Sequence, residues 1–245
     1  SYSVTGVQTC ALPISPLYPV LLAFLAWVTR LDAFQVGWLL NILLGGMNVW
    51  LAGLIFERVF MEKRILAYLF TVFVAFSLPL IKIAANIASD PLFITLVLSF
   101  FLVLRDWDGK STTGFTGLVL IVALSTLQRL LGVVLIPVGA LGILFAHKNN
   151  FWRGVWLAIF FAALAVLPLV VWLLGHNYLL YGTVFGPRSY EDMLPWKNFV
   201  DSTAKILDWF YPYYSAERLF PYHWIVFPFF RSEEHTSELQ SPNTI

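Results

Sequence analysis

One uncharged stretch near the beginning of the chain decides the fold: AFQVGWLLNILLGGMNVWLAGLIF, residues 33–56. A helix needs about 20 apolar residues to cross the hydrocarbon core of a bilayer, so this stretch is long enough. Lipid offers the backbone no hydrogen-bond partners, whereas a helix satisfies its own N–H and C=O groups. A strand of a membrane β-barrel would alternate apolar and polar residues, and this stretch does not. It therefore predicts a transmembrane α-helix.

Similar uncharged runs follow along the chain, and short charged segments separate them. Each run is expected to form a membrane-spanning helix. The expected spans cover residues 33–56, 65–81, 91–104, 111–128, 130–146 and 154–175. The third is short, so we expect its helix either to let Arg105 and Trp107 snorkel to the interface or to run deeper into the protein.

Residues 17–29 form a shorter apolar stretch after Pro16, and they predict a short interfacial or partly inserted helix. The expected fold class is therefore all-α. It is a polytopic transmembrane helical bundle of about six spans, with a short interfacial helix at its N-terminal side.

The composition supports a membrane protein and argues against a nucleic-acid-binding one. Hydrophobic residues make up 59% of the chain and charged residues only 12%, and the mean hydropathy is +0.78. Soluble domains carry about 25% charged residues, so a soluble core could not absorb this much apolar surface. The net charge is +1, and there is no basic stripe to neutralise a phosphate backbone. The lipid bilayer is thus the expected partner, and no nucleic acid is.

Lysine and arginine are distributed unevenly between the loops, which predicts the orientation. Cytoplasmic loops carry the excess of positive charge. The loops at one side contain Arg58, Lys63, Arg64, Arg105, Lys110, Lys148 and Arg153, whereas those at the other contain Arg30, Lys82 and Arg129. The first side is therefore expected in the cytoplasm, and the second outside it.

Both ends of the chain change character abruptly. A codon choice for residues 231–241 exists whose reverse complement encodes residues 4–14, and that nucleotide string matches a sequencing-library adapter. We therefore expect residues 1–14 and 231–245 to be adapter-derived and exclude them from the functional argument. This exclusion removes Cys10, which is the single cysteine of the chain, and His235 with its neighbouring glutamates as metal ligands.

Residues 189–230 are rich in aromatic side chains and prolines, and they are expected outside the cytoplasm. Trp and Tyr rings favour the membrane interface, so the segment is expected to anchor a surface loop at the headgroups. A platform on which a ligand stacks is the alternative.

Two arginines are candidates for a functional site, because ionisable groups near membrane depth are costly and mark function. Arg129 is the sole charge between residues 111 and 146, and a guanidinium at the outer face can hold a phosphate by paired hydrogen bonds. A topological anchor is its alternative role. Arg188 lies in a Gly/Pro-rich loop after the last span, where a generic turn explains it equally well.

Asp90 and Lys82 are the other two candidates, and both lie at the same expected face as Arg129. Asp90 precedes Pro91, so its carboxylate fits a helix N-cap, a functional role, or both. The Lys82 ammonium can either snorkel to the interface or bind an anion. No glycine loop for a nucleotide, no pair of metal-binding histidines and no serine elbow accompanies these residues.

Four short motifs follow one another in an order that resembles a known family. They are Pro16-Leu17-Tyr18-Pro19, Ala88-Ser89-Asp90-Pro91-Leu92-Phe93, Thr126-Leu127-Gln128-Arg129-Leu130-Leu131-Gly132, and the segment from His176-Asn177 to Gly186-Pro187-Arg188. Together they resemble the GT-C class of membrane glycosyltransferases. The match is to the bacterial branch related to protein mannosyltransferases and aminoarabinose transferases, and it covers residues 15–188.

The resemblance implies an enzyme of the bacterial inner membrane. It would transfer a sugar from a polyprenyl-phosphate donor to an unidentified acceptor outside the cytoplasm. It places the catalytic base upstream of Ser15, so the residues here would supply donor binding. Arg129 and Lys82 would offset the carrier phosphate, and Asp90 would orient the sugar, a divalent metal or a basic partner. A transporter, a flippase or a polysaccharide polymerase is the alternative, and a transporter is expected to show paired broken helices.

Overall fold

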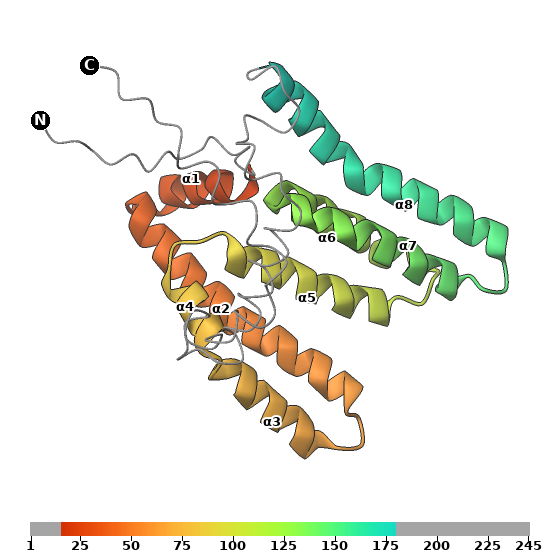
Figure 1. The fold of residues 1–245 in the computed structure, drawn as a ribbon, viewed down its shortest axis with the longest axis horizontal. Coiled ribbons are helices and arrows are strands. Elements are labelled where there is room, and N and C mark those ends of the chain that lie inside the picture. Colours follow the sequence, from red (N-terminus) through yellow and green to blue (C-terminus); the bar gives the residue numbers. More distant parts are fainter. Residues whose placement is uncertain (1–15, 180–245) are drawn as a thin grey trace, which may run out of the picture. The chain divides into compact units, whose positions relative to one another are not determined.

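The computed structural model describes residues 16–179, and all of them belong to the compact unit that spans Ser1–Met193. The unit Leu194–Ile245, which includes most of the aromatic-rich segment, lies outside the described residues, as do the expected adapter segments. Between residues 16 and 179 the chain forms helices joined by short loops and contains no strand, which confirms the all-α prediction (Figure 1).

The helices follow the apolar runs of the sequence, and short loops connect them. Their bounds are α1 Leu17–Thr29, α2 Ala33–Val59, α3 Arg64–Ala75, α4 Leu78–Ala85, α5 Asp90–Asp106, α6 Thr112–Gln128, the 3-10 helix η1 Leu130–Val134, α7 Leu135–Ala146, α8 Phe151–Trp172 and the π-helix η2 Leu173–Tyr178. Short polar side chains mark several N-termini, because an N-cap oxygen satisfies a free backbone N–H. Asp32 caps α2, Ser111 caps α6 and Asn150 caps α8.

Length and composition qualify α2 and the continuous helix Phe151–His176 as membrane spans. The bent pair α3 and α4 qualifies as a third span when its two helices are taken together. The helices α5 and α6 contain 17 residues each, which is about 25 Å of helix. The described part of the chain therefore has two to three helices able to cross a membrane, and six spans stays a prediction.

The expected span 65–81 is wrong in one respect, because the structure divides it. The helix ends at Ala75, resumes at Leu78 and bends by 48° at this break. Ser77 has extended backbone angles, and Pro79 lies in the first turn of α4. Serine before a helix with an early proline is a helix-start signal, and proline cannot donate the hydrogen bond that would continue α3.

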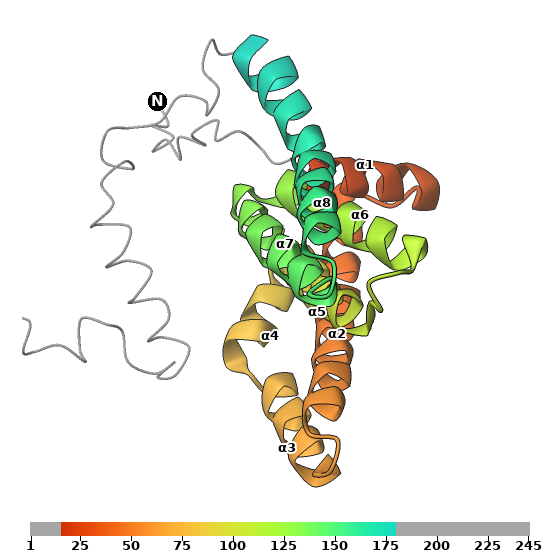
Figure 2. The same cartoon turned by 90° about the vertical axis from the view of Figure 1, so that its right-hand side faces the viewer.

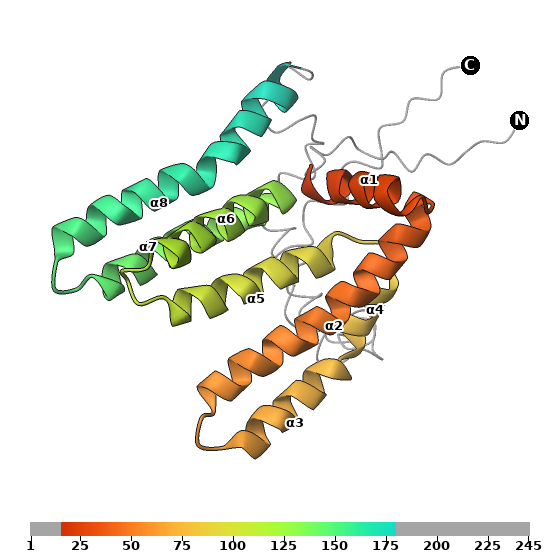
Figure 3. The same cartoon turned by 180° about the vertical axis from the view of Figure 1, so that it is seen from behind.

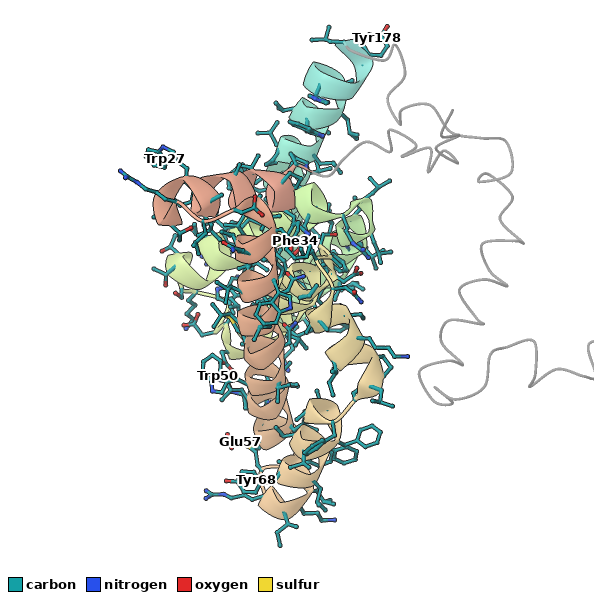
Figure 4. All side chains as sticks on the ribbon, turned by 90° about the vertical axis from the view of Figure 1, so that its left-hand side faces the viewer. Trp27, Phe34, Trp50, Glu57, Tyr68 and Tyr178 are labelled. Atoms are coloured by element: carbon teal, nitrogen blue, oxygen red, sulfur yellow. The ribbon has the colours of Figure 1, made fainter. Side chains whose placement is uncertain are left out.

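The core lies between α5, α6, α7 and α8, which run side by side (Figure 3). Phe100, Leu118, Ile143 and Phe161 contribute one buried side chain from each of these helices. The helix α2 packs against α5 on one side and against α3 and α4 on the other. Aromatic side chains such as Trp27, Trp50 and Tyr68 extend from the helices and stay exposed, as a lipid-facing surface requires (Figure 4).

The loops alternate between two ends of this bundle (Figure 3). One end carries α1, the 86–89 loop and Arg129, and we call it the α1 end. The other carries the loops 60–63, 107–111 and 147–150, and we call it the basic end. The helix α1 lies across the α1 end and contacts α2 and α6 (Figure 2). Its bounds are those expected for the interfacial helix.

Candidate functional site

Asp90 and Arg129 form an ion pair at the α1 end, although 39 positions separate them in sequence (129 minus 90). Arg129 Nη1 lies 2.7 Å from Asp90 Oδ1, and about a third of each side chain is exposed. The guanidinium carbon also lies 6.0 Å from the centre of the Phe93 ring, within the range of a cation–π contact. The structure thus joins two of the four expected site residues, and of the three alternatives for Asp90 it shows a basic partner, Arg129.

The chain turns at Arg129 as expected, and Gly132 makes the turn possible. The helix α6 ends at Gln128, Arg129 is extended, and the backbone N–H of Gly132 donates to the Arg129 carbonyl at 2.8 Å. A Cβ atom on Gly132 would lie 2.4 Å from the backbone carbon and oxygen of Ser125. Only glycine therefore lets η1 pack directly on the end of α6 and hold Arg129 at this corner.

The expected N-cap role of Asp90 is wrong by one position. Ser89 occupies the N-cap, Asp90 is the first residue of α5, and Pro91 follows it. The Asp90 carboxylate pairs with Arg129 rather than with a backbone N–H of its own helix. Its negative charge still lies at the positive end of the helix dipole, which is a favourable position.

Buried amide side chains hold the loop before Asp90, and sequence reasoning missed them. Gln128 Nε2 donates to the Ser89 carbonyl at 2.8 Å. Asn41 Nδ2 donates to the carbonyls of Asn86 and Ala88 at 2.6 and 2.9 Å. Asn41 and Gln128 are fully buried. Buried amides are costly unless they are bonded, so these bonds fix the loop strongly.

Asn48 extends the same support to the start of α5. Its Nδ2 atom donates to the Pro91 carbonyl at 3.0 Å, and its Oδ1 atom accepts from the Thr95 hydroxyl at 2.7 Å. Asn41 and Asn48 are two helical turns apart on α2, so they lie on the same face. We call Asn41, Asn48 and Gln128 the amide clamp. Two asparagines at this spacing within an uncharged span were the available sequence signal.

The helix α1 is tied to the amide clamp through Tyr18. The Tyr18 hydroxyl donates to Asn41 Oδ1 at 2.9 Å, and Tyr18 is buried. Burial raises the pKa of Tyr18 above its ordinary value, and the weaker opposing effect is the hydrogen bond to Asn41. The phenol therefore stays protonated at neutral pH and keeps its donor role.

The other two candidates are not joined to this pair. Lys82 lies in the last turn of α4 and is exposed, and its ammonium makes no hydrogen bond or ion pair with any residue from 16 to 179. Arg188 lies outside the described residues. No three His, Cys, Asp or Glu side chains gather to hold a metal within the described part of the chain.

An apolar cavity of about 340 Å³ lies between α2, the bent pair α3 and α4, and α5, and its lining reaches the start of α5 but includes neither Asp90 nor Arg129. Pro91, which directly follows Asp90, lines it together with Asn48 of the amide clamp. Its other lining side chains are mostly apolar, and the exposed residues Trp38, Ile42 and Ile81 are among them. A charged pair and an apolar cavity thus adjoin at the start of α5.

Comparison with protein-family models, with curated proteins and with solved structures finds no match. The geometry at the α1 end is therefore the basis on which a function can be argued.

Proposed function

We propose that the protein is part of an integral membrane glycosyltransferase that moves a sugar from a polyprenyl-phosphate donor to an acceptor at the α1 end. The observation that supports this proposal is the Asp90–Arg129 pair at the start of α5, where Pro91 also lines an apolar cavity. A lipid-linked sugar phosphate has the same two parts, because its charged phosphate adjoins an apolar chain.

The phosphate would bind Arg129. A guanidinium has five N–H donors, and one of its terminal nitrogens contacts Asp90. The remaining donors make no hydrogen bond with another described residue, and the side chain is partly exposed. An incoming phosphate can therefore take these donors, and it competes with the Asp90 carboxylate for the same positive charge.

The sugar would lie beside the Asp90 carboxylate, whose side chain is partly exposed. A carboxylate accepts hydrogen bonds from sugar hydroxyls, so it suits a polyhydroxylated ligand. The apolar cavity beside Pro91 would hold the carrier chain.

In the proposed reaction an acceptor oxygen attacks the anomeric carbon, and the bond from that carbon to the carrier phosphate oxygen breaks. The phosphate leaves with the bonding electrons, so its negative charge grows as the bond breaks. Arg129 would stabilise this growing charge. The proton of the acceptor would pass to a base, which the family resemblance places before Ser15. Arg129 is thus a donor-binding residue, and Asp90 positions it.

A transporter is the second candidate, because the break between α3 and α4 is of the kind that lines substrate paths in transporters. Such a protein would move the lipid-linked sugar without cleaving it. Release of free polyprenyl phosphate from a radiolabelled donor would separate the two, since a transporter leaves the donor intact.

The direct test is binding of polyprenyl phosphate to the full chain in lipid nanodiscs, with the uncharged polyprenol as the comparison ligand. We expect the phosphate to bind more tightly, and Arg129→Gln to weaken it about tenfold or more, because a charge-assisted phosphate contact is lost. Arg30→Gln is the matched control, since Arg30 is exposed at the same end and forms no ion pair with a described residue. Equal affinity for the phosphate and the polyprenol would contradict the proposal.

A further inference from the structure

Another cavity, of about 620 Å³, lies at the basic end between α2, α5 and the start of α6. We call it the basic-end cleft. Its lining includes Trp50, Arg58, Asp106, Trp107 and Asp108. Asp90 and Asp106 are the two ends of α5, and 17 helical residues span about 25 Å. The cleft is therefore separate from the Asp90–Arg129 site and has no part in the proposed transfer.

A guanidinium is held at one side of the cleft. Arg58 Nη2 lies 2.9 Å from Asp106 Oδ2, and the two side chains are 36% and 51% exposed. The Arg58 backbone carbonyl also accepts a hydrogen bond from Arg105 Nη2, which ties the end of α2 to the end of α5. Arg58 is thus fixed in place while part of its guanidinium stays accessible to a phosphate.

A carboxylate is held at another side of the cleft, in the 107–111 loop. Asp108 Oδ1 accepts hydrogen bonds from the backbone N–H groups of Lys110 and Ser111 at 2.9 and 2.8 Å. These bonds lower the pKa of Asp108, so it is ionised at neutral pH. The loop itself is braced by Trp107, whose Nε1 donates to the Ser111 carbonyl at 2.9 Å.

Two indole rings also line the cleft. Trp107 is partly buried against Phe115 and His147, whereas Trp50 is 61% exposed. Tryptophan favours the headgroup region of a bilayer, and its ring face attracts cations. Leu51 and Leu54 continue the lining from α2, so an apolar wall adjoins the charged groups.

The charges of this lining favour a zwitterion. Arg58 contributes one positive charge to the lining, Asp106 and Asp108 contribute two negative ones, and Arg105 and Lys110 lie next to the lining, so both signs of charge are present. A phosphate next to an ammonium matches the arrangement, with the phosphate at Arg58 and the ammonium at the carboxylates. An ammonium also donates hydrogen bonds, which a trimethylammonium group cannot.

We propose that the basic-end cleft binds phosphatidylethanolamine, with the headgroup phosphate at Arg58, the ammonium at Asp108 and one acyl chain along Leu51 and Leu54. The positive-inside rule would place this lipid in the cytoplasmic leaflet.

The test measures lipid retention by the full chain in detergent, by native mass spectrometry, with phosphatidylethanolamine, phosphatidylcholine and phosphatidylglycerol of identical acyl chains. We expect phosphatidylethanolamine to be retained about threefold or more over each of the others, since partly exposed charge pairs contribute modestly. Soluble glycerophosphoethanolamine would compete if the headgroup alone carries the recognition. Equal retention of the three lipids would overturn the proposal.

Single substitutions test which side chain contacts which part of the lipid. Asp108→Asn is expected to remove the preference for phosphatidylethanolamine over phosphatidylglycerol, because it removes one negative charge from the lining. Trp50→Ala should weaken retention of all three lipids, with Trp152→Ala as the matched control, since Trp152 is an exposed tryptophan at the same end outside the cleft lining. Arg58→Gln should weaken retention by removing the phosphate contact, and Arg153→Gln is its matched control. Arg58→Gln also removes an ion pair between α2 and α5 and could therefore prevent folding. If Arg58→Gln fails to fold, Asp108→Asn decides the outcome. An unchanged lipid preference in Asp108→Asn would refute the assignment.

Discussion

Each end of the bundle has an arginine–aspartate pair, and the two pairs are alike in themselves. Arg129 and Asp90 are 2.7 Å apart and Arg58 and Asp106 are 2.9 Å apart, and all four side chains are partly exposed. What differs is the support beneath them. The amide clamp is buried under the first pair, whereas exposed loops surround the second. The length of an ion pair thus says little about how rigidly its two residues are held. The hydrogen bonds to the backbone around those residues say more.

The largest expected effect comes from Gly132→Ala, which acts directly on the support of the first pair. Its Cβ would lie 2.4 Å from the Ser125 backbone, so η1 must move away from α6 and take Arg129 with it. We expect a loss of about 3 kcal/mol in unfolding free energy, at the upper end for overpacking, together with weaker binding of polyprenyl phosphate. Titration with SDS, followed by circular dichroism, measures the first effect.

Gly46→Ala is the matched control, because a Cβ at Gly46 meets nothing within 4 Å. It should leave the stability unchanged or raise it by about 0.5–1 kcal/mol, since alanine is the better helix former. If the two variants had equal stability, the close approach of η1 to α6 would not be what holds the α1 end.

A smaller effect is expected from Asn41→Ala, which opens the amide clamp. The carbonyls of Asn86 and Ala88 and the hydroxyl of Tyr18 would each lose a partner. We expect a loss of about 2 kcal/mol, because unsatisfied buried groups cost more than a typical bond contributes. The same SDS titration tests it, with Asn149→Ala at the basic end as the control, since Asn149 is exposed. A loss no greater than that of the control would remove the distinction between the two ends.

The smallest effect is expected at the basic end, from the pH dependence of Asp108. Backbone hydrogen bonds lower its pKa in the folded protein, so the folded state binds this proton less readily than the unfolded state. The resulting stability is fully present above the unfolded value of about 3.9 and is lost as the pH falls through the lowered folded value. Asp108→Asn should therefore reduce the thermal midpoint slightly at pH 7, and the difference should shrink below about pH 4. A difference that grows on acidification would contradict this assignment.

The sequence predicted the parts of the molecule that depend on local pattern. The apolar stretch 17–29 is a helix with those bounds, and the chain turns at Arg129, because a single charge in a long apolar run requires an interface. The motif residues Asp90 and Arg129 were both expected at one face. That they contact each other is a tertiary fact, since it depends on how α5 and α6 pack.

The amide clamp and the break at Ser77 were missed for different reasons. Asn41 and Asn48 carry no charge, so they do not interrupt an uncharged run, and their amide N–H groups donate to backbone carbonyls, which have no sequence signature. The break has a local signal in Ser77 and Pro79, but the apolar residues on both sides of it extend the run and concealed the signal. Polar residues within an apolar run therefore indicate buried contacts and helix breaks that the length of the run does not reveal.

The bond between Tyr18 and Asn41 gives α1 a mechanical connection to the site. About half of the side chains of α1, including Trp27, are exposed, and Tyr18 is the residue of this helix that is buried. Lifting α1 from the bundle breaks this bond, and Asn41 is the same residue that holds the carbonyls of the 86–89 loop. A displacement of α1 would therefore reach, through one phenol and one amide, the loop that leads into Asp90.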